Sequence, residues 1–168
     1  TAQAQNNTTE AWYSADVGYL ETKGIVLSNT SESSLYQQIS SGEYTRMVKA
    51  AYPNAAVQDS ISSSSISRQD AITVLMAAKG VDVNKDRWHN SSSFIDLSLV
   101  SNSNKNAILS AYWYGICKGC SGYCYPLKPL TFVDACVFIS RSLKNNEPEF
   151  RDVLPASTWN STLGLTPE

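Results

Sequence analysis

The chain has 168 residues, 42% of them hydrophobic, which is enough for one domain or two small ones with a buried core. Charged residues make up only 17% and the net charge is −2, so the chain has no basic field of the kind that attracts phosphate backbones, and we expect no nucleic-acid partner. No apolar run approaches the roughly 20 residues of a membrane span, so we expect no membrane insertion.

The scarcity of charge means that Ser, Asn, Gln and Thr must supply much of the polar surface. Uncharged polar surfaces are commoner outside cells than inside them. We therefore expect an exported protein with an extracellular, cell-surface location. In chain order, residues 1–11 read as an N-terminal extension ahead of the first amphipathic segment.

The first structured unit is expected to begin at Trp12, where an amphipathic segment runs to Gly24-Ile25. After a polar loop, Ser40 and Glu43 form a capping-box pattern, a hydroxyl followed three residues later by an acid, which predicts the start of a helix. Pro53 then ends this helix.

The same helix start occurs twice more. Ser67 with Asp70 predicts a helix that ends at Gly80, and Thr131 with Asp134 predicts a later one. Apolar residues at helical spacing follow each start, which predicts one buried face per helix. These faces are Tyr44, Met47, Val48 and Ala51, then Ala71, Val74, Leu75 and Ala78, then Ala135, Phe138 and Ile139.

The first and last units share their layout without a gap. Gly24-Ile25 and Gly115-Ile116 are separated by 91 positions, and so are Ile39-Ser40 and Leu130-Thr131. A third mark, an apolar residue, a spacer and Asp, lies downstream of each predicted helix and indicates where a new repeat begins. The three marks are Val57-Gln58-Asp59, Phe94-Ile95-Asp96 and Phe150-Arg151-Asp152.

Together, the Phe-x-Asp mark, the Gly-Ile turn and the [Ile/Leu]-[Ser/Thr]-x-x-[Glu/Asp] helix start resemble the S-layer homology repeats. The resemblance implies an all-α fold, a pseudo-threefold helical bundle with polar loops. It also implies attachment of an exported protein to bacterial cell-wall polysaccharide. The expected module spans 12–153, with degenerate repeats at about 12–56, 57–93 and 94–149 and a C-terminal tail at 154–168.

The chain departs from the family pattern where the family places an arginine in a groove for acidic sugar polymers. The matching positions hold Ser41, Arg68 and Phe132, so one arginine is retained. The resemblance implies that Arg68 and its neighbour Ser67 bind the ligand, because a guanidinium can grip a carboxylate with two hydrogen bonds. An exposed first-turn arginine is the alternative.

Aromatic rings are a second candidate for sugar contacts. Tyr112, Trp113 and Tyr114 lie in succession, and we take Trp113 as the residue that stacks on a sugar ring. Core packing is the alternative for two of the three, because the run has a helical position.

The repeat pattern is incomplete in two places. The middle repeat opens with the mark at 57–59, and only residues 59–66 lie before its helix start. That stretch is too short for a first helix, so the middle repeat is a half repeat. The last mark, 150–152, has no helix after it, whereas the segment at Trp12 has no mark before it. We expect these two ends to complete each other, within one chain or between neighbouring chains.

Four cysteines form the most specific chemical cluster: Cys117, Cys120, Cys124 and Cys136. In an exported chain an even number favours two disulfides, which is our prediction. A four-thiolate zinc site and intermolecular bridges are the alternatives.

Metal, cofactor and catalytic motifs are otherwise missing from the sequence. Asp82 opens a stretch that resembles a calcium loop, but its sixth position is Arg87 and its twelfth is Ser93. His89 is the single histidine, and the chain contains no nucleophile elbow, phosphate loop or dinucleotide fingerprint. We expect no metal, no cofactor and no enzymatic activity.

Two functions remain. The first is an anchor or assembly module at the cell envelope that binds acidic wall polysaccharide. The alternative is a self-assembling structural subunit of an extracellular filament, appendage or surface layer, a homo-oligomer cross-linked by disulfides.

Overall fold

Residues 10–85 and 94–148, the part of the chain that the computed structural model describes, are helical and contain no β-strand beyond isolated bridges. The all-α prediction is confirmed for these residues. Their elements are α1 (Ser14–Thr22), α2 (Glu32–Leu35), α3 (Ser41–Ala51), α4 (Arg68–Lys79), the 3-10 helix η2 (Leu97–Leu99), α5 (Asn102–Trp113) and α6 (Phe132–Lys144).

The three predicted helix starts are confirmed. Ser40 Oγ accepts the backbone N–H of Glu43 at 3.1 Å at the start of α3. The hydroxyls of Ser67 and Thr131 accept the equivalent N–H groups at the starts of α4 and α6, at 3.2 and 3.3 Å. Each hydroxyl therefore satisfies an N–H that has no partner inside its helix.

The carboxylates of the acids in the three capping patterns accept hydrogen bonds from other side chains. Instead of serving the helix start alone, these carboxylates link it to other side chains: Glu43 to Arg46, Asp70 to Asn104 and Asp134 to Arg68.

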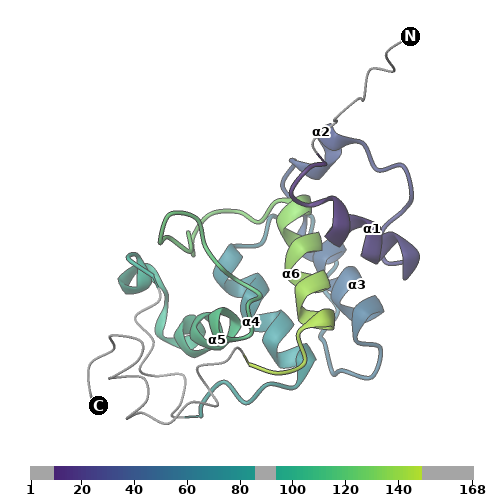
Figure 1. Cartoon of the computed structure of the whole chain (residues 1–168). Coiled ribbons are helices and arrows are strands. Elements are labelled where there is room, and N and C mark those ends of the chain that lie inside the picture. Colours follow the sequence, from purple (N-terminus) through teal and green to yellow (C-terminus); the bar gives the residue numbers. More distant parts are fainter. Residues whose placement is uncertain (1–9, 86–93, 149–168) are drawn as a thin grey trace.

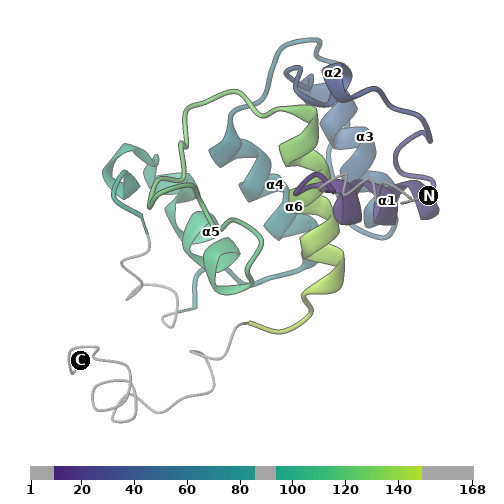
Figure 2. The ribbon, with the colours of Figure 1, turned by 45° about the horizontal axis from the view of Figure 1, so that its top comes forward.

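Helices α3, α4 and α6 pack against one another in the centre, and α6 lies between the other two in both views (Figures 1 and 2). Helix α1 packs on α6, and α5 packs on α4. The predicted apolar faces of the three central helices supply much of the core. Its largest fully buried side chains include Tyr44, Met47, Ile72, Leu75, Met76 and Ile139.

A closed set of backbone pairings joins the segments that lead into α3, α4 and α6. The N–H of Ile39 donates to the carbonyl of Leu130 at 3.0 Å, and the N–H of Leu130 donates to that of Ile66 at 2.8 Å. The N–H of Ser41 donates to the carbonyl of Ser64 at 2.8 Å, which completes the ring. The three helix starts are thus held at one end of the molecule.

The two Gly-Ile turns are alike in backbone geometry. Gly24 and Gly115 adopt φ values of 70° and 67°, in the left-handed region that favours glycine after a helix. In each turn the isoleucine N–H donates to the carbonyl five residues earlier, at 3.0 Å for Ile25 and 2.9 Å for Ile116. The 91-residue correspondence therefore extends to hydrogen bonding.

The predicted ends of two helices are also confirmed. Helix α3 ends before Pro53, and α4 ends at Gly80, whose φ is 79°, as predicted. Within the described residues there is no helix between α3 and α4. The mark at 150–152 and the tail at 154–168 lie outside the described residues. The predicted contact between the two chain ends therefore stays a prediction. None of the described helices combines the length and hydropathy of a membrane span.

Candidate functional site: a cationic groove

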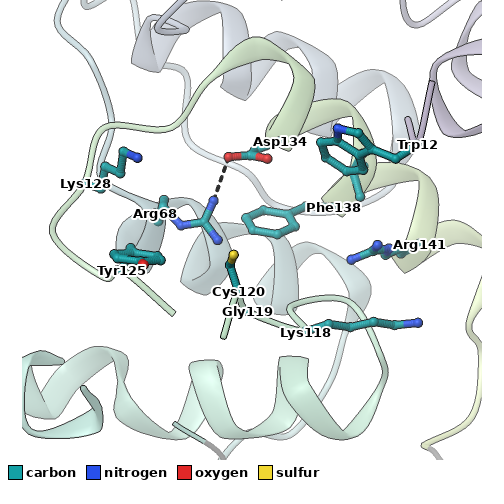
Figure 3. Close-up of a pocket in the computed structure, with 11 residues that line it drawn as sticks. Trp12, Arg68, Lys118, Gly119, Cys120, Tyr125, Lys128, Asp134, Phe138 and Arg141 are labelled. Atoms are coloured by element: carbon teal, nitrogen blue, oxygen red, sulfur yellow. Dashed lines mark hydrogen bonds and ion pairs between the residues drawn. The ribbon is translucent and has the colours of Figure 1, made fainter. Parts of the chain in front are cut away.

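A cavity of about 520 Å³ lies between the first turn of α4, the face of α6 from Asp134 to Arg141, and the loop that follows the second Gly-Ile turn (Figure 3). Four cationic side chains line it, Arg68, Lys118, Lys128 and Arg141, and one carboxylate, that of Asp134. The lining therefore has a formal net charge of +3. We call this cavity the cationic groove.

Arg68 is held at the floor of the groove by three contacts. Its Nε donates to the carbonyl of Cys124 at 3.0 Å, and its Nη1 donates to the carboxylate of Asp134 at 2.7 Å. The guanidinium also lies 5.0 Å from the ring centre of Phe138. Since the Arg68 side chain is only 11% exposed, these contacts fix its position and join α4, α6 and the loop.

The other three cations of the groove were missed by sequence reasoning. Lys128 is exposed, with Nζ 5.6 Å from the ring centre of Tyr125, and Lys118 is also exposed. Arg141 donates through Nη1 to the carbonyl of Ile116 at 3.2 Å. These cations come from two loop positions and from the last third of α6, so no spacing in the sequence connects them.

The two other predicted ligand residues do not join Arg68 in the groove lining. Ser67 caps α4 through its hydroxyl and is not among the lining residues. Trp113 is only 4% exposed, because α5 turns this face toward the core, so a sugar cannot reach its ring. The structure thus corrects the stacking assignment of Trp113 in favour of core packing.

The loop beside the groove is anchored by Asp96, the acid of the repeat mark at 94–96. Its two carboxylate oxygens accept the backbone N–H groups of Cys124 and Tyr125, each at 2.9 Å. Burial by itself raises the pKa of Asp96. The hydrogen bonds lower the pKa by more than burial raises it, so the pKa of Asp96 is below its usual value. Asp96 thus remains a charged anchor for the loop at neutral pH.

Backbone conformations in this loop are unusual. Tyr125 has a φ of 51°, which a residue with a side chain seldom adopts without support, and the Asp96 contact supplies that support. Gly119 has a φ of 71°, and a Cβ there would lie 2.6 Å from Phe94 Cε1 and 2.7 Å from the carbonyl of Tyr123. Only glycine fits this position without a shift.

The four cysteines lie in three different surroundings, and all are unpaired in the structure. Cys117 and Cys124 are buried and close enough to interact electrostatically, whereas Cys120 is exposed at the groove. Cys136 lies on the α1 side of α6, where its charged neighbours are Asp16 and Glu21. The structure therefore does not gather all four sulfurs, and the prediction of two disulfides stays a prediction.

Burial raises the pKa values of the three buried thiols. The pKa is raised to about 12 for Cys124, where burial is joined by the neighbouring Asp96 carboxylate, and to about 12 for Cys136. Burial is also the main cause of the raised pKa of Cys117. These raised pKa values favour the protonated, less nucleophilic form of all three thiols at neutral pH.

Metal alternatives find no ligand set in the described residues, where no three Cys, His, Asp or Glu side chains are placed to share an ion. The zinc alternative for the cysteines lacks its cluster. In the segment that resembles a calcium loop, Asp82 Oδ1 instead accepts the N–H of Asn84 at 3.1 Å, as in a turn. Arg87, His89 and Ser93 lie outside the described residues.

No protein-family model matches the chain, and no curated protein matches it.

Proposed function

We propose that the chain is a non-enzymatic module that binds acidic cell-wall polysaccharide through the cationic groove and so holds an exported protein at the cell surface. The observation that carries the proposal is the local charge of the groove. Its lining has a net charge of +3, while the whole chain has a net charge of −2. A concentrated positive field in a chain of opposite sign favours a localised anionic ligand.

The groove contains one largely buried, paired cation and two exposed ones. Arg68 is already paired with Asp134, whose carboxylate occupies the place that an anionic ligand group would take. Lys118 and Lys128 are exposed and reach an incoming anion first. We infer that these two lysines make the first contacts and that Arg68 supports the groove floor and adds to its field.

The S-layer homology-like architecture belongs to the same proposal. Three features support a degenerate pseudo-threefold bundle: three hydroxyl-capped central helices, the backbone ring at their starts, and two outer helices, α1 on α6 and α5 on α4. A matching third outer helix would pack on α3, and the short stretch before α4 leaves no room for it. The proposed architecture therefore has two complete repeats and one half repeat.

Binding to purified bacterial cell walls tests this function. The wild-type protein should sediment with the walls at low salt and be released as salt rises, because exposed ion contacts are screened. Replacing both exposed lysines, Lys118→Gln/Lys128→Gln, should weaken binding by about 2 kcal/mol, or roughly thirtyfold. Lys23→Gln/Lys85→Gln removes the same charge from exposed positions outside the groove and should leave binding within about twofold.

Two results would contradict the proposed wall-binding site. If the wild-type protein does not bind walls at low salt, or if the Lys23/Lys85 control loses as much affinity as the groove variant, the groove is not the wall-binding site. A general loss of that kind would indicate only a non-specific charge effect.

A second function has one observation in its favour. Cys120 is exposed beside the groove, where a second copy can reach its thiol, which suits a disulfide-linked structural subunit. A non-reducing gel of native material, read beside its size in solution, tests this alternative. Dimers or ladders that disappear in the Cys120→Ser variant would support it, and a monomer with or without reductant would reject it.

A further inference from the structure

The cationic groove has an exposed aromatic ring at each end. Trp12, just before α1, is 59% exposed and lies at the same end of the groove as Arg141 (Figure 3). At the opposite end Tyr125 is 42% exposed and lies beside Lys128. Each end therefore presents both a flat apolar face and a cation.

The ring at the loop end is part of a pair. Tyr123 and Tyr125 are stacked, with centroids 5.7 Å apart and planes inclined by 28°. At that separation the rings are offset, and Tyr123 remains 37% exposed. The pair thus extends the flat apolar surface beyond the groove.

The tyrosine pair is fixed before any ligand arrives. Gly122 accepts the N–H of Ile95 at 2.8 Å, and Cys120 and Tyr123 exchange two backbone hydrogen bonds of 2.9 and 3.0 Å. Asp96 holds the backbone of Tyr125 at a φ of 51°. Unusual backbone conformation held by surrounding contacts is typical of functional sites, and a preformed ring loses little entropy on binding.

We propose that the groove binds an internal stretch of a carboxylated hexose polymer, with sugar faces on Trp12 and on the Tyr123–Tyr125 pair and carboxylates at the cations between them. This inference rests on the proposed function and names its ligand class. Hexopyranose rings combine an apolar face of C–H groups with polar edges, which suits exposed aromatic rings beside cations. A polyanion without rings would use the cations alone.

The ligand pair that separates these possibilities is a labelled oligogalacturonate, which has rings and carboxylates, and a labelled polyphosphate, which has charge without rings. Fluorescence anisotropy at fixed low salt gives the Kd of each. The variants are Tyr123→Ala/Tyr125→Ala and Trp12→Ala. Tyr36→Ala is the matched control, because Tyr36 is 51% exposed and lies outside the groove lining.

The aromatic variants should each bind oligogalacturonate about tenfold more weakly, as expected for the loss of a contact residue that contributes to binding. Their Kd for polyphosphate should stay within about twofold of wild type, and Tyr36→Ala should change neither. Monomeric galacturonate, which cannot reach both ends, should bind far more weakly than the oligomer to the wild-type protein. Thermal unfolding of each variant confirms that the folded protein is being compared.

Failure of the inference and failure of the proposed function give different results. If aromatic variants bind oligogalacturonate as wild type does, or lose both ligands equally, the stacking inference is overturned while acidic-polymer binding stands. If the protein binds cell walls but not oligogalacturonate, the ligand class is wrong. If it binds neither, the proposed function falls as well.

Discussion

The loops that follow the two Gly-Ile turns begin alike and are then held in different ways. Both leave a turn with the same hydrogen bonds, and both end in a segment of the backbone ring. The first loop contains a short helix, α2, whose start is capped by Ser31 within the loop itself. The second contains no helix and is anchored by Asp96, which lies 28 residues before Cys124.

This difference shows how one frame carries two kinds of loop. The first loop combines its local cap with a bond from Arg46 to the carbonyl of Ile25 and a backbone bond from Phe132 to Gln37, and it gathers no comparable set of cations. The second loop depends on distant partners, Asp96 and Arg68, for its backbone N–H and C=O groups. Long-range anchoring leaves its side chains free to line the groove, and it makes the loop sensitive to changes elsewhere in the chain.

The largest expected effect compares two glycines, one at each loop. Gly119→Ala should destabilise the protein by about 3 kcal/mol, because its Cβ would meet Phe94 and a backbone carbonyl at a positive φ. Gly24→Ala should cost only about 1 kcal/mol, since its φ is 70° but nothing lies within 4 Å. Urea unfolding measures both, and equal losses would contradict the idea that the second loop is the more tightly packed.

The next comparison concerns two arginines, each of which donates to a loop carbonyl. Arg68→Gln breaks a largely buried ion pair and its bond to Cys124, and should cost about 2–3 kcal/mol. Arg46→Gln breaks an exposed pair with Glu43 and a bond to Ile25, and should cost less than about 1 kcal/mol. Chemical denaturation at neutral pH is the measurement.

The same arginine separates stability from binding. Removal of Arg68 should also weaken binding to acidic wall polysaccharide by about 1.5–3 kcal/mol. The binding assay therefore needs a temperature at which the Arg68 variant is fully folded, verified by circular dichroism. Unchanged wall affinity in the folded variant would confine Arg68 to a structural role.

The acids of the repeat marks give a smaller effect with a defined pH dependence. The pKa of Asp96 is lowered by folding, so its stabilisation is present above the unfolded value near 3.9 and is lost as pH falls through the folded value. Asp96→Asn should cost about 1–2 kcal/mol at pH 7 and progressively less below about pH 4. Asp59→Asn, at an exposed acid paired with Lys49, should change stability by less than about 0.5 kcal/mol.

Unfolding curves from pH 2 to 7 decide this prediction. The difference between wild type and Asp96→Asn should shrink toward acid, while the Asp59→Asn difference stays near zero. A constant difference across the range would mean that the charge of Asp96 is not what anchors the loop.

The smallest effect on stability is expected at the exposed thiol. Cys120→Ser should change the free energy of unfolding by less than about 0.5 kcal/mol, because the side chain is at the surface. In reduced protein at pH 8, Cys120 should react first with maleimide, since burial raises the pKa values of the other three thiols. Mass spectrometry of the labelled protein identifies the site, and early labelling of Cys136 would contradict its burial under α1.

The sequence by itself determined the local features of this fold. The three hydroxyl caps, the ends of α3 and α4 and the two Gly-Ile turns were all predicted and are all present. Each depends on hydrogen bonds or backbone angles within about five residues, so the residues that decide it are adjacent in the chain. The all-α class was expected from the resemblance of these signals to a known repeat family, and it is confirmed for the described residues.

Tertiary structure alone decided the groove. Sequence reasoning found Arg68 but not Lys118, Lys128 or Arg141, because these cations meet only when α4, α6 and the second loop pack together. Trp113 shows the converse, since a helical position fits both core and surface until α5 packs on α4 and buries that ring. Long-range packing fixes which side chains converge, and a pattern read over a few residues contains no measure of that distance.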